Sequence, residues 1–247
     1  MKHYIPNFLT LLNLFCGSIA VILAVNNNFV AAALFVFLGI FFDFFDGFAA
    51  RKLGVSSELG IQLDSLADMV TSGLVPGIVM YKLLALTINL PETSTNWGDT
   101  PNWLNLNMPV LPLLGLCIAL ASAYRLAKFN LDEDQQTYFK GLPTPANALL
   151  ILSLPLILEF QNSNLINNII INKWFLIGLT LISCYLLNSN IKLFALKIKD
   201  WSFKANALRY TFLILCVLLL ILFKFIAIPL IIILYIVLSI LGNITSK

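Results

Sequence analysis

Four aspartates in two apolar segments are the residues of this sequence best suited to chemistry. Asp43 and Asp46 lie near the end of one apolar segment, and Asp64 and Asp68 lie near the start of the next. A charged side chain at the centre of a membrane helix costs about 2.5–3.5 kcal/mol on insertion scales. Four such side chains therefore indicate a polar cavity or a bound cation.

Helical spacing predicts that these carboxylates form two acidic faces. Asp43 and Asp46 are three residues apart and Asp64 and Asp68 are four apart, so each pair shares one face of its helix. The same faces carry the small residues Gly47, Ala50 and Gly60. Small residues let two helices, or a helix and a ligand, approach closely. We therefore expect the short loop 52–57 to bring the two acidic faces opposite each other.

The residue types predict hard divalent metal ions. Four carboxylates in one pocket cannot all ionise unopposed, and the nearby Arg51 and Lys52 are too few to balance them. The single histidine, His3, lies far from the cluster in sequence, and no cysteine accompanies it. Oxygen ligands favour Mg²⁺ or Mn²⁺ over zinc or copper. Two such ions would suit a phosphoryl displacement, and the residues alone leave a carboxylate-based cation transporter open as the alternative.

The composition places the aspartates in a membrane protein. Hydrophobic residues make up 60% of the 247 residues and charged residues only 11%, whereas a soluble domain carries about 25% charged residues. Apolar segments occur at 5–25, 29–50, 58–86, 109–128, 144–160, 168–188, 207–223 and 227–243. Each is near the length of about 20 residues that a membrane-spanning helix needs. We expect an all-α polytopic helical bundle, in which the last two segments form a tight hairpin or one broken element.

The basic residues predict the orientation. If the N-terminus is cytoplasmic and all eight segments span, twelve of the fifteen Lys and Arg residues fall on the cytoplasmic side. The loop 88–108, which would lie outside, has no Lys or Arg. We expect a multi-pass protein of the cell (inner, cytoplasmic) membrane with the aspartates facing the cytoplasm. The net charge of +3 is small and scattered, so nucleic acid is not an expected partner.

One motif makes the chemistry more specific. The pattern Asp43-x2-Asp46-Gly47-x2-Ala50-Arg51-x8-Gly60-x3-Asp64-x3-Asp68 matches in full the signature of the CDP-alcohol phosphotransferase family. The resemblance implies transfer of a phospho-alcohol from a CDP-linked donor to a hydroxyl, with release of CMP, and it disfavours the transporter. It also implies a single transmembrane catalytic domain over 1–247, with a six-helix core at 1–190 and extra C-terminal helices at 207–243. Homodimers occur in this family.

The resemblance assigns roles residue by residue. Asp43, Asp46 and Asp64 resemble the metal ligands of the family. Asp68 resembles a ligand of the second metal and also the general base that deprotonates the acceptor hydroxyl. The positions that resemble donor-substrate contacts are Gly47, Arg51, Ser57 and Gly60.

The first apolar segment adds two candidates for the donor site. Thr10 and Asn13 share one side of a helix with Asn7 because the three residues are spaced by three. This polar face suits a ligand pocket and helix–helix hydrogen bonds equally well. We place Thr10 and Asn13 among the residues that bind the CDP-linked donor.

Two further stretches resemble the phosphatidylserine synthase branch of the family. Residues 124–130 resemble its RLARFN-like stretch, and residues 139–146 resemble the Gly-Leu-Pro-x-Pro stretch that follows. This resemblance implies CDP-diacylglycerol and L-serine as substrates, with acceptor contacts from Arg125, Lys128 and Asn130. Lys128 stands where an Arg is common, which keeps the charge but loses the bidentate fork. Ordinary positive-inside residues, and acceptors such as glycerol 3-phosphate or inositol phosphate, stay open as alternatives.

Overall fold

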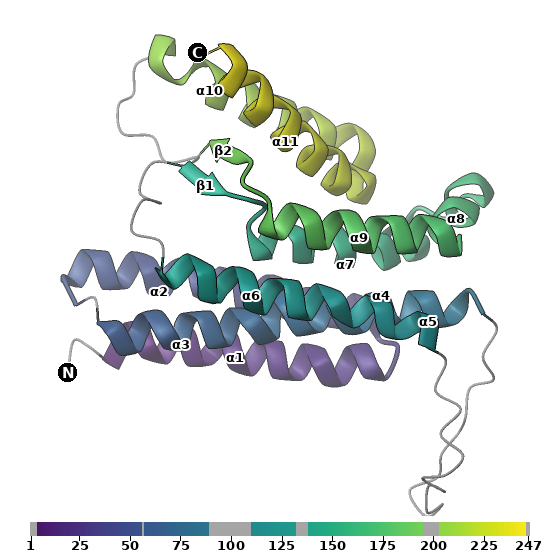
Figure 1. The fold of residues 1–247 in the computed structure, drawn as a ribbon, viewed down its shortest axis with the longest axis horizontal. Coiled ribbons are helices and arrows are strands. Elements are labelled where there is room, and N and C mark those ends of the chain that lie inside the picture. The colour runs from purple at the N-terminus through teal and green to yellow at the C-terminus, as the bar shows by residue number, and fades with distance from the viewer. Residues whose placement is uncertain (1–3, 56, 89–109, 132–137, 195–202, 246–247) are drawn as a thin grey trace, which may run out of the picture.

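The computed structural model describes residues 4–55, 57–88, 110–131, 138–194 and 203–245. Its helices run back and forth between the two ends of a bundle (Figure 1). The first half of the chain forms α1 (Tyr4–Val25), α2 (Phe29–Leu53), α3 (Glu58–Asp68), the π-helical turn η1 (Met69–Leu74), α4 (Val75–Leu86), α5 (Val110–Leu113), the 3-10 turn η3 (Leu114–Leu116) and α6 (Cys117–Leu131). The second half forms β1 (Tyr138–Lys140), α7 (Thr144–Phe160), α8 (Asn164–Ile170), α9 (Lys173–Asn188), β2 (Lys192–Phe194), α10 (Phe203–Phe223), the 3-10 turn η4 (Lys224–Ile226) and α11 (Ala227–Thr245).

Most of these stretches are long and apolar enough to cross a membrane. Five stretches of the described chain meet that test by length and composition, and a sixth does so if the bent pair α8 and α9 counts as one span. The five are Tyr4–Val25, Phe29–Leu53, Glu58–Leu86, Val110–Leu131 and Arg209–Gly242. The protein is therefore an all-α polytopic membrane protein, as predicted.

The sixth predicted segment, 168–188, does not form one helix. It divides into α8 and α9, which meet at an angle of 58°. Asn172 causes the break because its side chain accepts hydrogen bonds from the backbone N–H groups of Trp174 and Phe175 and so starts a new helix.

The C-terminal apolar stretch folds back on itself. Helices α10 and α11 lie side by side and contact each other along their length (Figure 1). The chain reverses at η4, where Lys224 has a φ of 49°. Of the two forms expected for residues 207–243, the structure adopts the hairpin.

A short antiparallel ribbon ties the start of α7 to the end of α9. Strand β1 pairs with β2 so that Lys140 lies opposite Lys192. Gly141 follows with a φ of 75°, and a Cβ there would come within 2.6 Å of the Leu187 carbonyl oxygen. Sequence analysis did not predict these strands, because three residues are too few to show an alternating pattern.

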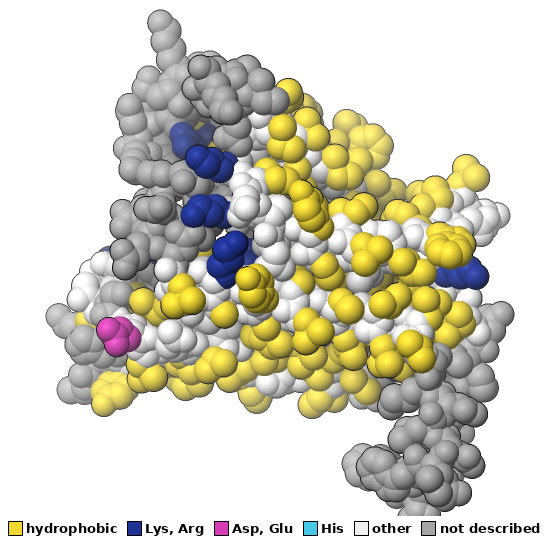
Figure 2. All heavy atoms as spheres, in the orientation of Figure 1, with side chains coloured by type: hydrophobic (Ala, Val, Ile, Leu, Met, Phe, Trp, Pro, Cys, Tyr) yellow, Lys and Arg dark blue, Asp and Glu magenta, His cyan; other side chains and the backbone are white. Residues whose placement is uncertain are grey.

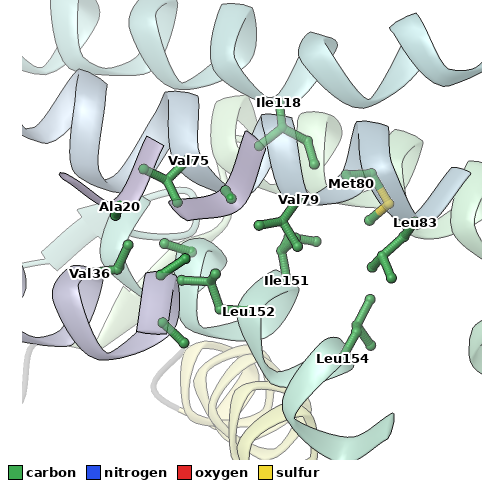
Figure 3. Packing of buried hydrophobic residues seen from close by; sticks show 14 of the residues in the cluster. Ala20, Val36, Val75, Val79, Met80, Leu83, Ile118, Ile151, Leu152 and Leu154 are labelled. Atoms are coloured by element: carbon green, nitrogen blue, oxygen red, sulfur yellow. The ribbon is translucent and has the colours of Figure 1, made fainter. Parts of the chain in front are cut away.

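The core lies where four spans and α7 meet. Ala20 of α1, Val36 of α2, Val79 of α4, Ile118 of α6 and Ile151 of α7 belong to one buried cluster (Figure 3). Helix α7 is therefore a central element of the bundle, although at 17 residues it is shorter than the other spans.

The outer surface matches a lipid environment, and its charge is uneven. Hydrophobic side chains cover much of the face seen in Figure 2, while most of its basic side chains gather at one end. Ten Lys and Arg side chains are described, and seven of them belong to the end of the bundle that carries the aspartates. The other three are Lys82, Lys173 and Lys224.

Candidate active site

Helices α2 and α3 bring three of the four aspartates into one cluster. Asp43, Asp64 and Asp68 each offer a carboxylate oxygen, and these oxygens lie within 4.8 Å of one another. The third span changes from α-helix to the π-helical turn η1 directly after Asp68. Such turns are frequent at functional sites, and no feature of the sequence predicted this one.

Helix α1 supplies hydrogen-bond donors to the aspartates. The Thr10 hydroxyl donates to Oδ2 of Asp46 at 2.5 Å, and the Asn13 amide donates to Oδ1 of Asp68 at 3.2 Å. Asp46 and Asp68 are only 6% and 9% exposed. Both hydrogen-bond donors are neutral. They therefore leave the negative charge of the two carboxylates available to a bound cation.

The close crossing of three helices holds Asn13 in place. A Cβ on Gly39 would come within 2.7 Å of the Thr71 methyl group and 2.8 Å of Asn13 Oδ1. A Cβ on Gly17 would fall on the Thr71 side chain, 3.1 Å from its Cα. The Thr71 hydroxyl donates to the Asn13 carbonyl oxygen at 3.2 Å. The two glycines therefore allow η1 to reach α1 and α2 directly beneath the carboxylates.

Ser57 and Gly60 form the start of α3. The Ser57 hydroxyl oxygen accepts a hydrogen bond from the Gly60 N–H at 3.1 Å and so caps the helix. A Cβ on Gly60 would come within 3.2 Å of Ser57 Oγ and 3.4 Å of Asn7 Oδ1. Both residues thus shape the helix end, and Gly60 leaves space beside Asn7.

A cleft of about 200 Å³ adjoins the acidic cluster between α1, α2 and α3. Seven of the predicted site residues line it, namely Thr10, Asp46, Gly47, Arg51, Ser57, Gly60 and Asp64. The Arg51 guanidinium lies over Gly47, where a Cβ would be 3.4 Å from Nη1. Asn7, which shares the predicted polar face with Thr10, also lines the cleft.

The ligand atoms fit a hard divalent cation. Oδ1 of Asp64 is buried and has no hydrogen-bond partner within the described part of the chain. A buried carboxylate oxygen is costly unless a donor or a cation satisfies it. The oxygen-only set of Asp43, Asp64 and Asp68 matches the preference of Mg²⁺ and Mn²⁺.

The predicted acceptor residues separate into two groups. Arg125 and Lys128 line a small basic pocket together with Lys140 and Asn188. The Arg125 guanidinium is buried, and it lies within electrostatic reach of Asp68.

Asn130 lies elsewhere, against α3. Its amide donates to the Ser65 hydroxyl at 2.9 Å, beside Asp64 in the sequence. The structure thus brings Arg125 and Lys128 together and gives Asn130 a contact that positions α6 against α3.

One fully buried polar residue of α7 was not predicted at all. Asn147, in the first turns of α7, is 0% exposed, and neither its Nδ2 nor its Oδ1 has a hydrogen-bond partner among the described residues. Water or a bound polar ligand would be needed to satisfy it. A lone asparagine carries no sequence signature, so only the fold reveals it.

The fold and the site together define a polytopic membrane enzyme with an acidic centre at one end of its helical bundle. A family model described as CDP-alcohol phosphatidyltransferase matches residues 3–185. The chain belongs to this family, which confirms the family predicted from the aspartate signature and removes the transporter alternative.

Curated relatives show the same affiliation. The chain is 35% identical over 156 residues to CDP-diacylglycerol–serine O-phosphatidyltransferase of Bacillus subtilis, covering 62% of this chain and 75% of the relative. It is 33% identical over 179 residues to the protein of that name in Methanocaldococcus jannaschii, covering 72% and 71%. It is also 30% identical over 151 residues to archaetidylserine synthase of Methanothermobacter thermautotrophicus, covering 60% and 56%.

Proposed function

We propose that this protein transfers the phosphatidyl group of CDP-diacylglycerol to the hydroxyl of L-serine, giving phosphatidylserine and CMP. The observation that carries the proposal is the acidic cluster of Asp43, Asp64 and Asp68 beside a cleft that contains Arg51. The names of similar proteins support serine as the acceptor, because they specify serine or a serine lipid product.

The cleft supplies the proposed donor site. The planar guanidinium of Arg51 suits two diphosphate oxygens at once, and the missing side chain of Gly47 leaves room beside it. Thr10, Ser57 and Gly60 line the same space. Asn13 is not among the residues that line the cleft, and it contributes to the site through its hydrogen bond to Asp68.

Asp43, Asp46, Asp64 and Asp68 are the proposed ligands of one or two Mg²⁺ or Mn²⁺ ions. When bound, such ions neutralise charge on the diphosphate and on the departing CMP. Oδ1 of Asp64, which is buried and has no hydrogen-bond partner among the described residues, supports this assignment.

Asp68 is the proposed general base. Asn13 donates to Oδ1 of this carboxylate, which leaves Oδ2 to accept the proton of the serine hydroxyl. The serine oxygen then bonds to the phosphorus that carries diacylglycerol, and the bond from that phosphorus to the CMP oxygen breaks.

The acceptor is proposed to bind at the opening of the small basic pocket, which by itself has a volume of about 10 Å³. Arg125 and Lys128 would bind the serine carboxylate, and Asn130 would position the end of α6 through Ser65. Lys140 adds a third cation to this pocket. That observation keeps a phosphorylated acceptor, such as glycerol 3-phosphate or inositol phosphate, as the second candidate.

We further propose that the end of the bundle with the aspartates faces the cytoplasm of the cell membrane. The concentration of seven of the ten described basic side chains at that end supports this orientation. We treat residues 1–190 as the catalytic core and the helices in 207–243 as an addition to the same domain. The homodimer stays a prediction.

A test uses purified protein, CDP-diacylglycerol, Mn²⁺ or Mg²⁺ and separate acceptors. We expect CMP release that depends on L-serine and yields phosphatidylserine. Release that depends only on a phosphorylated alcohol would overturn the serine assignment and favour the second candidate. No release with any acceptor would contradict the proposed reaction.

A further inference from the structure

The C-terminal hairpin is attached to the bundle at its turn. Gln161, at the end of α7, donates from Nε2 to the Phe223 carbonyl oxygen at 3.0 Å and accepts at Oε1 from the Ile226 N–H at 3.0 Å. The rings of Phe160 and Phe225 stack with their centroids 5.2 Å apart. These contacts fasten the turn between α10 and α11 to α7.

A second attachment lies toward the opposite end of the hairpin. The rings of Phe194, Phe212 and Tyr235 contact one another with centroids 4.9 to 5.7 Å apart. The Tyr235 hydroxyl also donates to the Phe194 carbonyl oxygen at 2.9 Å. The hairpin is therefore fixed to β2 as well as to α7.

Between the two attachments the hairpin stands away from the bundle. A cleft of about 930 Å³ lies between α2, α7, α10 and α11. Its walls are almost wholly apolar and include Ala33, Phe37, Ala146, Leu156, Cys216 and Ile232. An apolar cleft of this size suits an apolar ligand such as a lipid chain.

The attachments of the hairpin favour a lipid chain over a membrane-spanning protein segment. Ile226 and Tyr235, which make these attachments, are nine residues apart, or about 14 Å along the helix. The space between them is therefore shorter than a membrane-spanning helix of about 30 Å.

The cleft adjoins the candidate active site. Phe37 in its wall precedes Asp43 by six residues on α2, which is about 9 Å along the helix axis. Tyr235, also in the wall, lies within electrostatic reach of Arg125, and Arg125 lies within reach of Asp68. A lipid whose diphosphate lay at the aspartates would therefore have this cleft close to its glycerol end.

We infer that the cleft holds an acyl chain of the lipid donor and that α10 and α11 form the wall that selects chain length. The inference rests on the proposed function. The hairpin lies beyond residues 3–185, the part that matches the family model, so this wall is an addition to the family core.

The test compares two neighbouring substitutions. Cys216→Phe places a ring in the cleft, whereas Val217→Phe places it on a residue that is 57% exposed and is not in the wall. We expect Cys216→Phe to raise KM for dioleoyl CDP-diacylglycerol about five-fold or more and to leave KM for a dioctanoyl donor within about two-fold. Val217→Phe should change neither value. Ala146→Phe fills the cleft from α7 and should act as Cys216→Phe does.

A binding measurement separates the donor from bulk lipid. A CDP-diacylglycerol analogue with a diazirine on its acyl chain should label cleft residues of α7, α10 or α11. Excess CDP-diacylglycerol should suppress the labelling, and phosphatidylcholine should not. Equal KM changes for both donors, or labelling that phosphatidylcholine suppresses equally, would overturn the inference. No CMP release by the unsubstituted protein with either donor would instead overturn the proposed function, and the inference with it.

Discussion

The amide of Asn13 donates to Oδ1 of Asp68 at 3.2 Å across the contact between α1 and α3. Because this hydrogen bond is made to Oδ1, it leaves Oδ2 of Asp68 to accept the proton of the serine hydroxyl. Because hydrogen bonds to charged groups contribute about 1.5–3 kcal/mol, the contact is strong enough to be measured kinetically.

Replacement of Asn13 by Ala should lower kcat about 10-fold or more, because Asp68 loses its donor and its fixed orientation. Ser18→Ala is a matched control, since the Ser18 hydroxyl lies on an exposed face of the same helix and donates to the Leu14 carbonyl oxygen. Its turnover should stay within about two-fold of the unsubstituted protein. Equal effects of the two substitutions on serine-dependent CMP release would show that Asn13 is not a positioning residue.

Asp68→Asn should reduce turnover by about 100-fold or more, since general-base catalysis typically contributes 10²–10⁴-fold. The substitution keeps the size of the side chain and removes its ability to accept the serine proton. Donor binding, measured directly with labelled CDP-diacylglycerol, should change far less than turnover. Near-normal CMP release from this variant would eliminate the base role of Asp68.

Arg51→Lys should raise KM for the donor about 10-fold, because Lys keeps the charge but lacks the planar fork that grips two oxygens. Lys52 follows Arg51, is exposed and does not line the cleft, so Lys52→Ala serves as the control. The comparison is made in steady-state assays with the donor varied and serine saturating. An unchanged KM in Arg51→Lys would mean that the guanidinium does not hold the diphosphate.

Chelation of divalent ions should abolish CMP release, and added Mn²⁺ or Mg²⁺ should restore it. Mn²⁺ binding can also be followed without turnover by electron paramagnetic resonance of the free ion. Asp64→Asn should weaken that binding, because the unpaired Oδ1 of Asp64 would lose its negative charge. Binding of equal strength in Asp64→Asn and the unsubstituted protein would contradict the role of Asp64 as a ligand.

Gly17→Ala should destabilise the protein by about 1–3 kcal/mol, as overpacking of a tight contact usually does. The added Cβ would fall on Thr71 at the crossing of α1 with η1. Gly178→Ala is the matched control, because a Cβ there meets no atom within 4 Å and Ala favours a helix over Gly by up to about 1 kcal/mol. Thermal unfolding in detergent should show a lower midpoint for Gly17→Ala alone.

The relation between sequence and structure differs from feature to feature. The shared face of Asp64 and Asp68 follows from their spacing of four residues, which helix geometry converts directly into one acidic face. The approach of Asp43 to this face was predicted from the short connection between the two helices. The spans follow in the same way from apolar length. Both predictions rest on local periodicity, which a single sequence displays.

Other features depend on contacts between distant segments. The π-helical turn after Asp68 forms where Thr71 meets Gly17 and Gly39, residues of two other helices. The isolation of Asn147 likewise depends on the helices that surround α7. Asn172 is a residue type that commonly caps helices, so the break could have been predicted. The apolar residues on both sides made the segment resemble one helix.

The β1–β2 ribbon connects the places proposed for the two substrates. Phe194 of β2 accepts the hydrogen bond from Tyr235 of the hairpin, and Lys140 of β1 lines the basic pocket. Lys140 pairs with Lys192 in the same ribbon, so one pair of strands joins the hairpin to the pocket. The C-terminal hairpin and the basic pocket, which lie far apart in the sequence, therefore share one supporting element.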